Sequence, residues 1–275
     1  EKFSGRLKHN NMSFKDVDET LIRDWTHELS EVVCEEYGNG IMKSSGKNTY
    51  LMDRIERTAV SSISAVAAHM KAGSFEQTAY EIAFERLSDV PSFNYELSEG
   101  SMLHLTGKID RIDTFEEDGK IYVKIIDYKT GAKKFDLKRL YYGLDMQLSV
   151  YLHATKDIME RSRADKIVVP AGMFYFHIDE PVYEEDKKDA PYRMEGPANR
   201  ELPVPYLIDS RLNADGRLTP GITSEIIKVS TDKQGDIKGS AETLNNNEFS
   251  YIMKAAKDKI FEIGDRIIQG GTAVN

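Results

Sequence analysis

The sequence predicts an α/β fold, with a mixed central sheet flanked by helices, and three observations support this prediction. Apolar residues recur at helical spacing before residue 74. From Thr78 the pattern changes to short apolar runs separated by turn residues such as Asp118-Gly119. A second helical pattern over 137–159 then precedes the most apolar run of the chain, 167–177. The expected order is therefore helices, three strands, a helix and a strand.

Two amino-terminal helices are predicted from apolar stripes. The first has a start signal at Ser13–Asp16 and stops near Gly38, and its stripe comprises Val17, Leu21, Trp25, Leu29 and Val32. The second ends near Gly73, and its stripe comprises Met52, Ile55, Ala59, Ile63, Val66 and Met70. Such stripes predict packing surfaces and imply no chemistry.

One domain over 1–275 is expected, in four parts. A helical part covers 1–74, and a core over 75–180 holds strands near 79–84, 102–113, 120–129 and 167–177. An irregular insertion is expected over 181–246, because five of the eight prolines lie between Pro181 and Pro205. A helix over 247–275 is predicted to end at Gly270-Gly271.

The overall charge of −9 argues against a protein that binds nucleic acid through its whole surface. Between Lys124 and Arg139, however, six basic residues stand against two acids. Such a cluster is typical of phosphate contacts in an acidic protein, but taken alone it is better explained as a solvated loop. Lys133 and Lys134 are its candidates for contact with DNA.

The sequence predicts no membrane partner. Its most apolar run is far shorter than the ~20 residues of a membrane-spanning helix, and Pro170 and Gly172 interrupt it. No signal peptide is expected from Glu1–Arg6, so we expect a cytoplasmic location. Cys34 is the only cysteine, which excludes an internal disulfide or a cysteine-rich metal cluster within this chain.

The chemistry is expected where two predicted strands carry acids. Alternation along the second strand places Asp127 and Lys129 on one face, and pairing with the Gly107–Asp113 strand would bring Asp110 to the same point. Two adjacent carboxylates repel unless they share a cation, and hard oxygen ligands suit Mg²⁺ or Mn²⁺. A lysine beside such an ion can orient water and stabilise phosphoryl charge, which indicates phosphodiester hydrolysis. The tripeptide Asp-Tyr-Lys alone would leave metal catalysis a minority interpretation.

The order and spacing of these residues resemble the RecB-like branch of the PD-(D/E)XK nuclease superfamily. There a glycine-led Asp-Arg-x-Asp strand precedes an Asp-x-Lys strand. The resemblance implies a restriction-endonuclease-like core, with Asp110, Asp127 and Lys129 as catalytic residues. It also implies that the two acids and the carbonyl of Tyr128 hold the metal.

The same resemblance assigns supporting roles. Gln147 and Tyr151 match the branch's Gln-x-x-x-Tyr motif and, four apart on a helix, are expected to face the site. Glu81 stands where the branch carries an acid on an earlier strand, so it is expected to touch the metal or the lysine. A surface glutamate is the alternative. Arg111, within the Asp-Arg-x-Asp motif, is a candidate for supporting or contacting DNA.

The runs 139–147 and 170–177 resemble the AddB family, the nuclease-bearing partners in the AddAB helicase-nucleases, along nearly the whole chain. This closer resemblance implies the carboxy-terminal nuclease domain of a bacterial enzyme that resects double-strand breaks. It further implies Mg²⁺-dependent cleavage of a single DNA strand in the cleft, with a helicase-nuclease A subunit as partner.

That family also carries a histidine metal ligand and four cysteines that hold an iron–sulfur cluster. His9, His27 and His69 do not fit the histidine pattern, and the four cysteines are absent. The cluster is therefore expected only in a full-length AddB protein, not in this chain.

Two other functions remain open. One is a noncatalytic DNA-binding or scaffold module that kept the fold, and the other is a further PD-(D/E)XK nuclease, such as a restriction or CRISPR-adaptation nuclease. Catalysis is favoured over a scaffold, because a scaffold has no physical need to place two acids and a lysine together. The Tyr141–Leu144 run favours the AddB family over the other nucleases.

Overall fold

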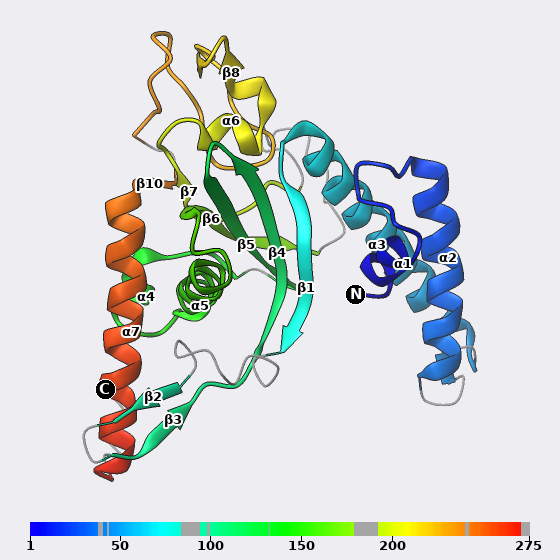
Figure 1. Ribbon diagram of the computed structural model, residues 1–275. Coiled ribbons are helices and arrows are strands. Elements are labelled where there is room, and N and C mark those ends of the chain that lie inside the picture. Colours follow the sequence, from blue (N-terminus) through cyan, green and yellow to red (C-terminus); the bar gives the residue numbers. More distant parts are fainter. Residues whose placement is uncertain are drawn as a thin grey trace.

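A mixed six-stranded sheet forms the centre of the molecule (Figure 1). The computed structural model describes residues 1–37, 41–42, 44–83, 94–97, 100–131, 133–178, 192–239 and 242–270. The strands, in spatial order, are β1 (Glu76–Ala83), β4 (Lys108–Glu117), β5 (Lys120–Lys129), β6 (Ile167–His177), β7 (Ala198–Asn199) and β10 (Thr243–Leu244). Strands β1, β4 and β5 are antiparallel, while β6 runs parallel to β5. The predicted α/β fold with a mixed sheet is confirmed.

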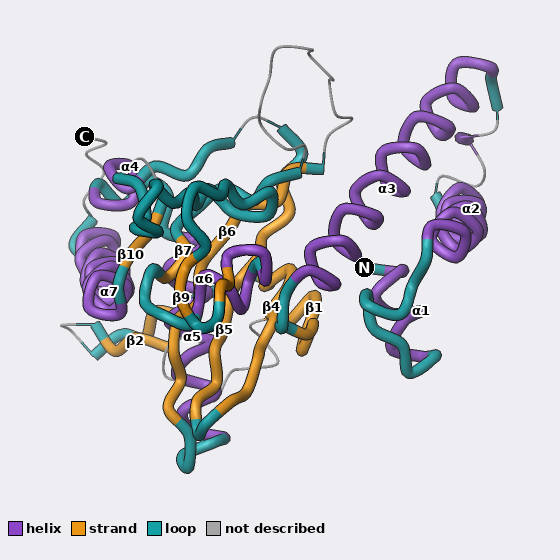
Figure 2. The backbone as a smooth tube through the Cα atoms, turned by 90° about the horizontal axis from the view of Figure 1, so that it is seen from above, coloured by secondary structure: helices purple, strands orange, loops and turns teal. Residues whose placement is uncertain are grey.

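Helices surround this sheet on both faces (Figure 1). Three precede it: α1 (Lys2–His9), α2 (Glu19–Glu36) and α3 (Gly46–Ala72). Four others are α4 (Leu137–Tyr141), α5 (Gln147–Ser162), α6 (Val204–Ile208) and α7 (Asn246–Ile268), and a short 3₁₀ helix covers Ser210–Leu212. Helix α5 packs on β5 and β6, with α7 outside it. Figure 2 shows the α1–α3 group beside β1, on the side away from α7.

Alternation along the strands explains why both faces of the sheet are apolar. Val123 and Ile125 of β5 join a core with α5 and α7, whereas Tyr122 and Ile126 join a core with Met70 of α3. Neighbouring β6 repeats the pattern, because Met173 and Tyr175 belong to the first core and Phe174 and Phe176 to the second. The functional side chains therefore project from a rigid scaffold.

The helix starts follow local capping chemistry. The side chain of Asp18 accepts from the Leu21 N–H at 2.8 Å, so α2 begins at Glu19. The start expected at Ser13–Asp16 is wrong, because those residues form a separate turn in which the Ser13 N–H donates to Asp16 Oδ2 at 2.7 Å. Asn245 and Glu248 form a capping box that opens α7.

Three other expectations need correction. Of the strand expected over 102–113, Met102–His104 is β3, which pairs with β2 (Asn94–Glu96) in a separate small sheet. The helix expected over 137–159 is broken, since Gly143 adopts a left-handed φ of +75° between α4 and α5. The insertion is less irregular than expected: it supplies β7 to the central sheet and a hairpin of β8 (Asn213–Ala214) and β9 (Arg217–Leu218).

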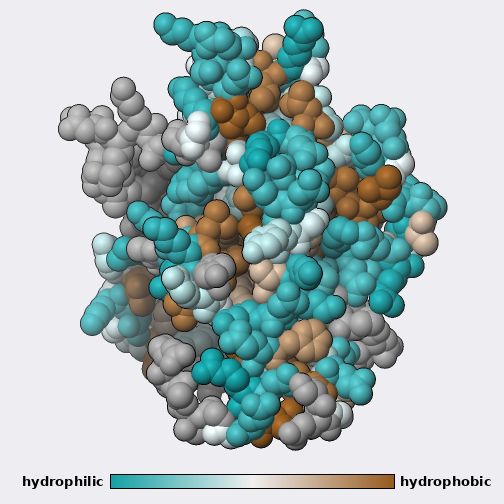
Figure 3. All heavy atoms as spheres, turned by 90° about the vertical axis from the view of Figure 1, so that its left-hand side faces the viewer, coloured by the Kyte–Doolittle hydropathy of each residue, from teal (hydrophilic) through white to brown (hydrophobic). Residues whose placement is uncertain are grey.

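Parts of several expectations lie outside the described residues, namely Gly38, residue 84, the stretches 181–191 and 240–241, and residues 271–275. Within the described part of the chain, no helix combines the length and apolar character needed to cross a bilayer. Figure 3 shows the side of the molecule that carries α7, where small apolar patches are separated by polar side chains.

Candidate metal and catalytic site

Asp110 and Asp127 meet where β4 and β5 end their pairing. The ladder pairs Ile112 with Ile125 and Arg111 with Ile126, and continuing it by one residue sets Asp110 opposite Asp127. Directly opposed side chains of antiparallel strands point to the same face of the sheet. Asp110 Oδ2 also accepts from the backbone N–H of Tyr128 at 2.9 Å, which anchors its carboxylate at the strand end.

Asp127 is almost fully buried on the face that α5 covers, with 1% of its side chain exposed. Gln147 Nε2 donates to Asp127 Oδ1 at 2.8 Å, and the ammonium of Lys129 contacts Oδ2. Burial raises the pKa of Asp127, and the charge of Asp110 acts in the same direction, against the opposing effect of Lys129. The structure thus forces two carboxylates close together in a poorly solvated place.

Gln147 connects the acid to the lysine. Its Oε1 accepts from Lys129 Nζ at 3.1 Å while its Nε2 donates to Asp127 and, at 3.0 Å, to the hydroxyl of Tyr151. The ammonium of Lys129 also lies 5.4 Å from the ring centre of Tyr175. Gln147 and Tyr151 are one turn apart at the start of α5, so the helix brings both to the site, where the sequence expected them.

Glu81 lies in the same row of strands. The pairs Tyr80–Arg111 and Ile82–Ile109 bracket it, which sets Glu81 beside Asp110, and its φ of +53° is unusual for a residue with a side chain. Its carboxylate contacts the ammonium of Lys108. Among the described contacts, then, Glu81 pairs with Lys108 rather than with Lys129.

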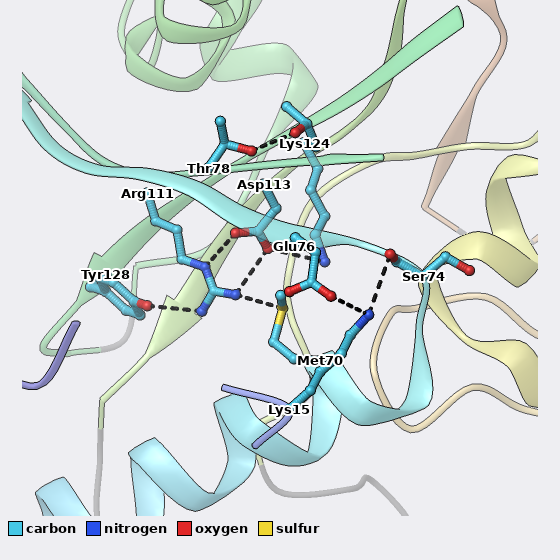
Figure 4. A network of polar contacts seen from close by, with 10 residues as sticks. Lys15, Met70, Ser74, Glu76, Thr78, Arg111, Asp113, Lys124 and Tyr128 are labelled. Atoms are coloured by element: carbon cyan, nitrogen blue, oxygen red, sulfur yellow. Dashed lines mark hydrogen bonds and ion pairs between the residues drawn. The ribbon is translucent and has the colours of Figure 1, made fainter. Parts of the chain in front are cut away.

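Arg111 faces the other side of the sheet (Figure 4). Only 2% of its side chain is exposed, and it donates to both oxygens of Asp113, at 2.6 and 3.0 Å. Lys124 reaches the same carboxylate at 3.3 Å and is likewise buried. Burial lowers the pKa of Lys124. Because both side chains are buried, neither cation can contact DNA. Lys124 is therefore not part of a basic surface cluster, and Arg111 is not a DNA-contacting residue.

Sequence reasoning missed this buried network, although a signal for it exists. Arg111 and Asp113 alternate with apolar residues and so share a face of β4, and Lys124 lies directly across from Asp113 on β5. The guanidinium of Arg111 also reaches the hydroxyl of Tyr128 at 3.3 Å. The network therefore helps to hold Tyr128, whose carbonyl the family resemblance assigns to the metal.

Lys133 and Lys134 lie in the segment that follows β5. The ammonium of Lys133 pairs with Asp145 at 2.6 Å and lies 5.0 Å from the ring centre of Tyr175, while Lys134 is exposed. Tyr175 donates to Asp145 at 3.3 Å, and burial raises its pKa. Sequence reasoning singled out neither residue, because Tyr175 lies in the apolar run of β6, which predicted only a core strand, and Asp145 lies in what was expected to be a continuous helix.

The donor set fits a hard divalent cation. Two carboxylates approach each other from neighbouring strands. Burial raises the pKa of Asp127 and the charge of Asp110 adds to that effect, so a cation between the two acids would stabilise their charged forms. No group of three or more His, Cys, Asp and Glu side chains suited to a metal occurs among the residues that the structure describes. A metal at this site would therefore depend on two carboxylates, main-chain carbonyl oxygen and water.

Comparison with known proteins gives two findings. Residues 4–265 match the family model described as the PD-(D/E)XK nuclease superfamily. The chain is also 31% identical to the B subunit of the ATP-dependent helicase/deoxyribonuclease of Clostridium kluyveri, over 100% of this chain and 24% of that protein. The corresponding protein of Lachnoclostridium phytofermentans is 32% identical, over 98% of the chain and 23% of the protein. The chain thus spans about a quarter of the length of these relatives.

Proposed function

Because the chain belongs to the PD-(D/E)XK nuclease superfamily, as its motifs predicted, we propose that it cleaves DNA phosphodiesters with a divalent metal. The observation that carries this proposal is the convergence of Asp110, Asp127 and Lys129, with Gln147 linking acid to lysine. The substrate proposed is a single DNA strand, because the related proteins are named as helicase/deoxyribonucleases and a helicase separates strands.

The carboxylates of Asp110 and Asp127 and the carbonyl of Tyr128 would hold Mg²⁺ or Mn²⁺. When bound, the ion polarises a phosphoryl oxygen and makes water a better nucleophile. Lys129 keeps its ammonium at the site through Asp127 and Gln147, so its protons can orient the attacking water and stabilise charge on the phosphoryl group. Gln147 holds Lys129 and Asp127 next to each other, and its hydrogen bond to Tyr151 fixes the orientation of Gln147.

The wider assignment rests on the relatives. We propose that residues 1–275 form one nuclease domain of an AddB protein, which works with DNA and an A subunit in double-strand-break resection in the bacterial cytoplasm. The noncatalytic scaffold is less well supported, because a scaffold would not need Gln147 to bridge a buried acid and a lysine.

Asp127→Asn provides the direct test of this function. The parental chain is expected to cleave labelled single-stranded DNA in Mg²⁺ and to stop in EDTA, and the variant is expected to lose at least about a hundredfold in rate. Asparagine keeps the size and one acceptor of Asp127 but removes the charge that binds the ion. Asp258→Asn, on an exposed acid of α7, is the matched control and should cleave normally. Equal rates for parent and Asp127→Asn would support the scaffold instead.

Metal binding is expected to be weak. Because the described acids and histidines offer no third side-chain ligand, water should complete the coordination, and the ion should exchange readily. Titration calorimetry with Mn²⁺ measures this affinity, and tight stoichiometric binding would contradict the two-carboxylate site.

The same purified chain should lack the visible absorbance of an iron–sulfur cluster, since it has one cysteine.

A further inference from the structure

The segment 133–145, between β5 and α5, forms a hydrogen-bonded turn beside the candidate site. Backbone N–H groups of Tyr142, Gly143 and Leu144 donate to carbonyls of α4 at 3.1, 3.0 and 2.9 Å. The left-handed φ of Gly143 lets the chain reverse there. With its donors satisfied, this turn keeps its shape without a ligand.

Asp145 fixes the end of the segment to the site. Lys133 binds one carboxylate oxygen at 2.6 Å, Arg139 lies 3.6 Å from the other, and Tyr175 donates at 3.3 Å. The ring of Tyr175 also lies under the ammonium of Lys129, so a single aromatic ring separates the candidate catalytic lysine from the segment's anchor.

This rigid turn presents apolar side chains to solvent instead of burying them. Tyr142 is 68% exposed and Leu144 is 65% exposed. Most of each side chain therefore faces solvent, and the backbone hydrogen bonds of the turn do not involve these side chains. An exposed aromatic ring on a rigid support is the kind of surface on which nucleic-acid bases stack.

The charge around Tyr142 is positive, in contrast to the net −9 of the chain. Residues 133–145 contain four cations, Lys133, Lys134, Lys138 and Arg139, against the carboxylates of Asp136 and Asp145. Asp145 is already engaged by two of these cations, and Asp136 accepts from the Lys138 N–H at 2.8 Å as the cap of α4. The exposed ammoniums of Lys134 and Lys138 remain for phosphates.

We propose that the 133–145 segment is the docking platform for the single strand, on which one base stacks against Tyr142 while Lys134 and Lys138 contact flanking phosphates. This rests on the proposed nuclease function and adds the subsite that holds the strand before it reaches the metal. Stacking on a tyrosine tolerates any base, so the platform binds DNA without sequence preference.

The test compares two probes of equal length, a labelled oligo-dT and the same sugar-phosphate backbone without bases. Binding is measured by fluorescence anisotropy in EDTA, so that no cleavage occurs. Tyr142→Ala should bind oligo-dT about fivefold to a hundredfold more weakly, as expected for loss of one stacked base, and bind the abasic probe unchanged. Tyr142→Phe should retain parental binding, because it keeps the ring.

Two further variants separate stacking from charge and from exposure. Lys138→Ala should weaken both probes alike and reduce the dependence of binding on salt. Tyr50→Ala removes an equally exposed tyrosine, at 65%, from α3 and should change neither probe.

If Tyr142→Ala keeps the parental preference for oligo-dT over the abasic probe, or if the parental chain shows no such preference, the platform is refuted. Cleavage in Mg²⁺ that depends on Asp127 would then still uphold the proposed function, so the two failures are distinguishable.

Discussion

Lys129→Ala is expected to lower the rate of DNA cleavage by at least about a hundredfold to a thousandfold. The ammonium of Lys129 is held beside Asp127 and Gln147, at the point where an attacking water and a phosphoryl oxygen would meet. Alanine removes both the donor and the positive charge, and no other described lysine contacts Asp127. Single-turnover cleavage of labelled single-stranded DNA measures the loss.

The control for this variant is Lys134→Ala. Lys134 is exposed in the 133–145 segment, so its loss should weaken DNA binding and reduce the salt dependence but leave the single-turnover rate at saturating protein near the parental value. Lys134→Ala should unfold at nearly the same temperature as the parent, because Lys134 is exposed. Lys129→Ala is expected to unfold at a somewhat lower temperature, because it leaves the buried carboxylate of Asp127 without its cation, so cleavage is measured where both variants are folded. Parental cleavage by Lys129→Ala would mean that the motif is structural.

Asp113→Ala is expected to cost about 3–5 kcal/mol of folding free energy, the largest stability effect that we predict. Asp113 is fully buried and supplies the counter-charge for both Arg111 and Lys124, which are themselves 2% and 3% exposed (Figure 4). Without the carboxylate, two buried cations would face each other with no compensation. Equilibrium unfolding in urea, read as the change in midpoint at constant slope, measures the loss.

Glu116→Ala on the same strand is the matched control. Glu116 pairs with Arg163 and Lys166, but its side chain is 39% exposed, so water screens the ion pairs and the expected loss of folding free energy is much smaller than that of Asp113→Ala. Equal losses for the two variants would contradict a special role for the buried network. If Asp113→Ala still folds, its cleavage rate is also expected to fall slightly, since Arg111 donates to the hydroxyl of Tyr128 beside the candidate metal site.

Local sequence patterns predicted the parts of the site that depend on neighbouring residues. Alternation in β5 correctly placed Asp127 and Lys129 on the face of Val123 and Ile125, because backbone geometry alone sets that period. The four-residue spacing of Gln147 and Tyr151 likewise predicted that one turn of helix would present both. The same reasoning did not predict the burial of Arg111. The residue type indicates only a charge, whereas its burial depends on α3, whose Met70 covers that face of β4.

The sequence by itself determined the α/β class, the apolar strands and the existence of long amino-terminal and carboxy-terminal helices, and it proposed two acids and a lysine as the candidate site. These follow from side-chain periodicity and residue chemistry, which act within a few residues of each other. Only the tertiary structure decided that β7 and β10 complete the sheet, that Glu81 pairs with Lys108 and that Asp113 neutralises two buried cations. It also decided that Tyr175 stands between Lys129 and the 133–145 segment. Strand register and burial bring together residues far apart in the chain, and no local pattern encodes those distances.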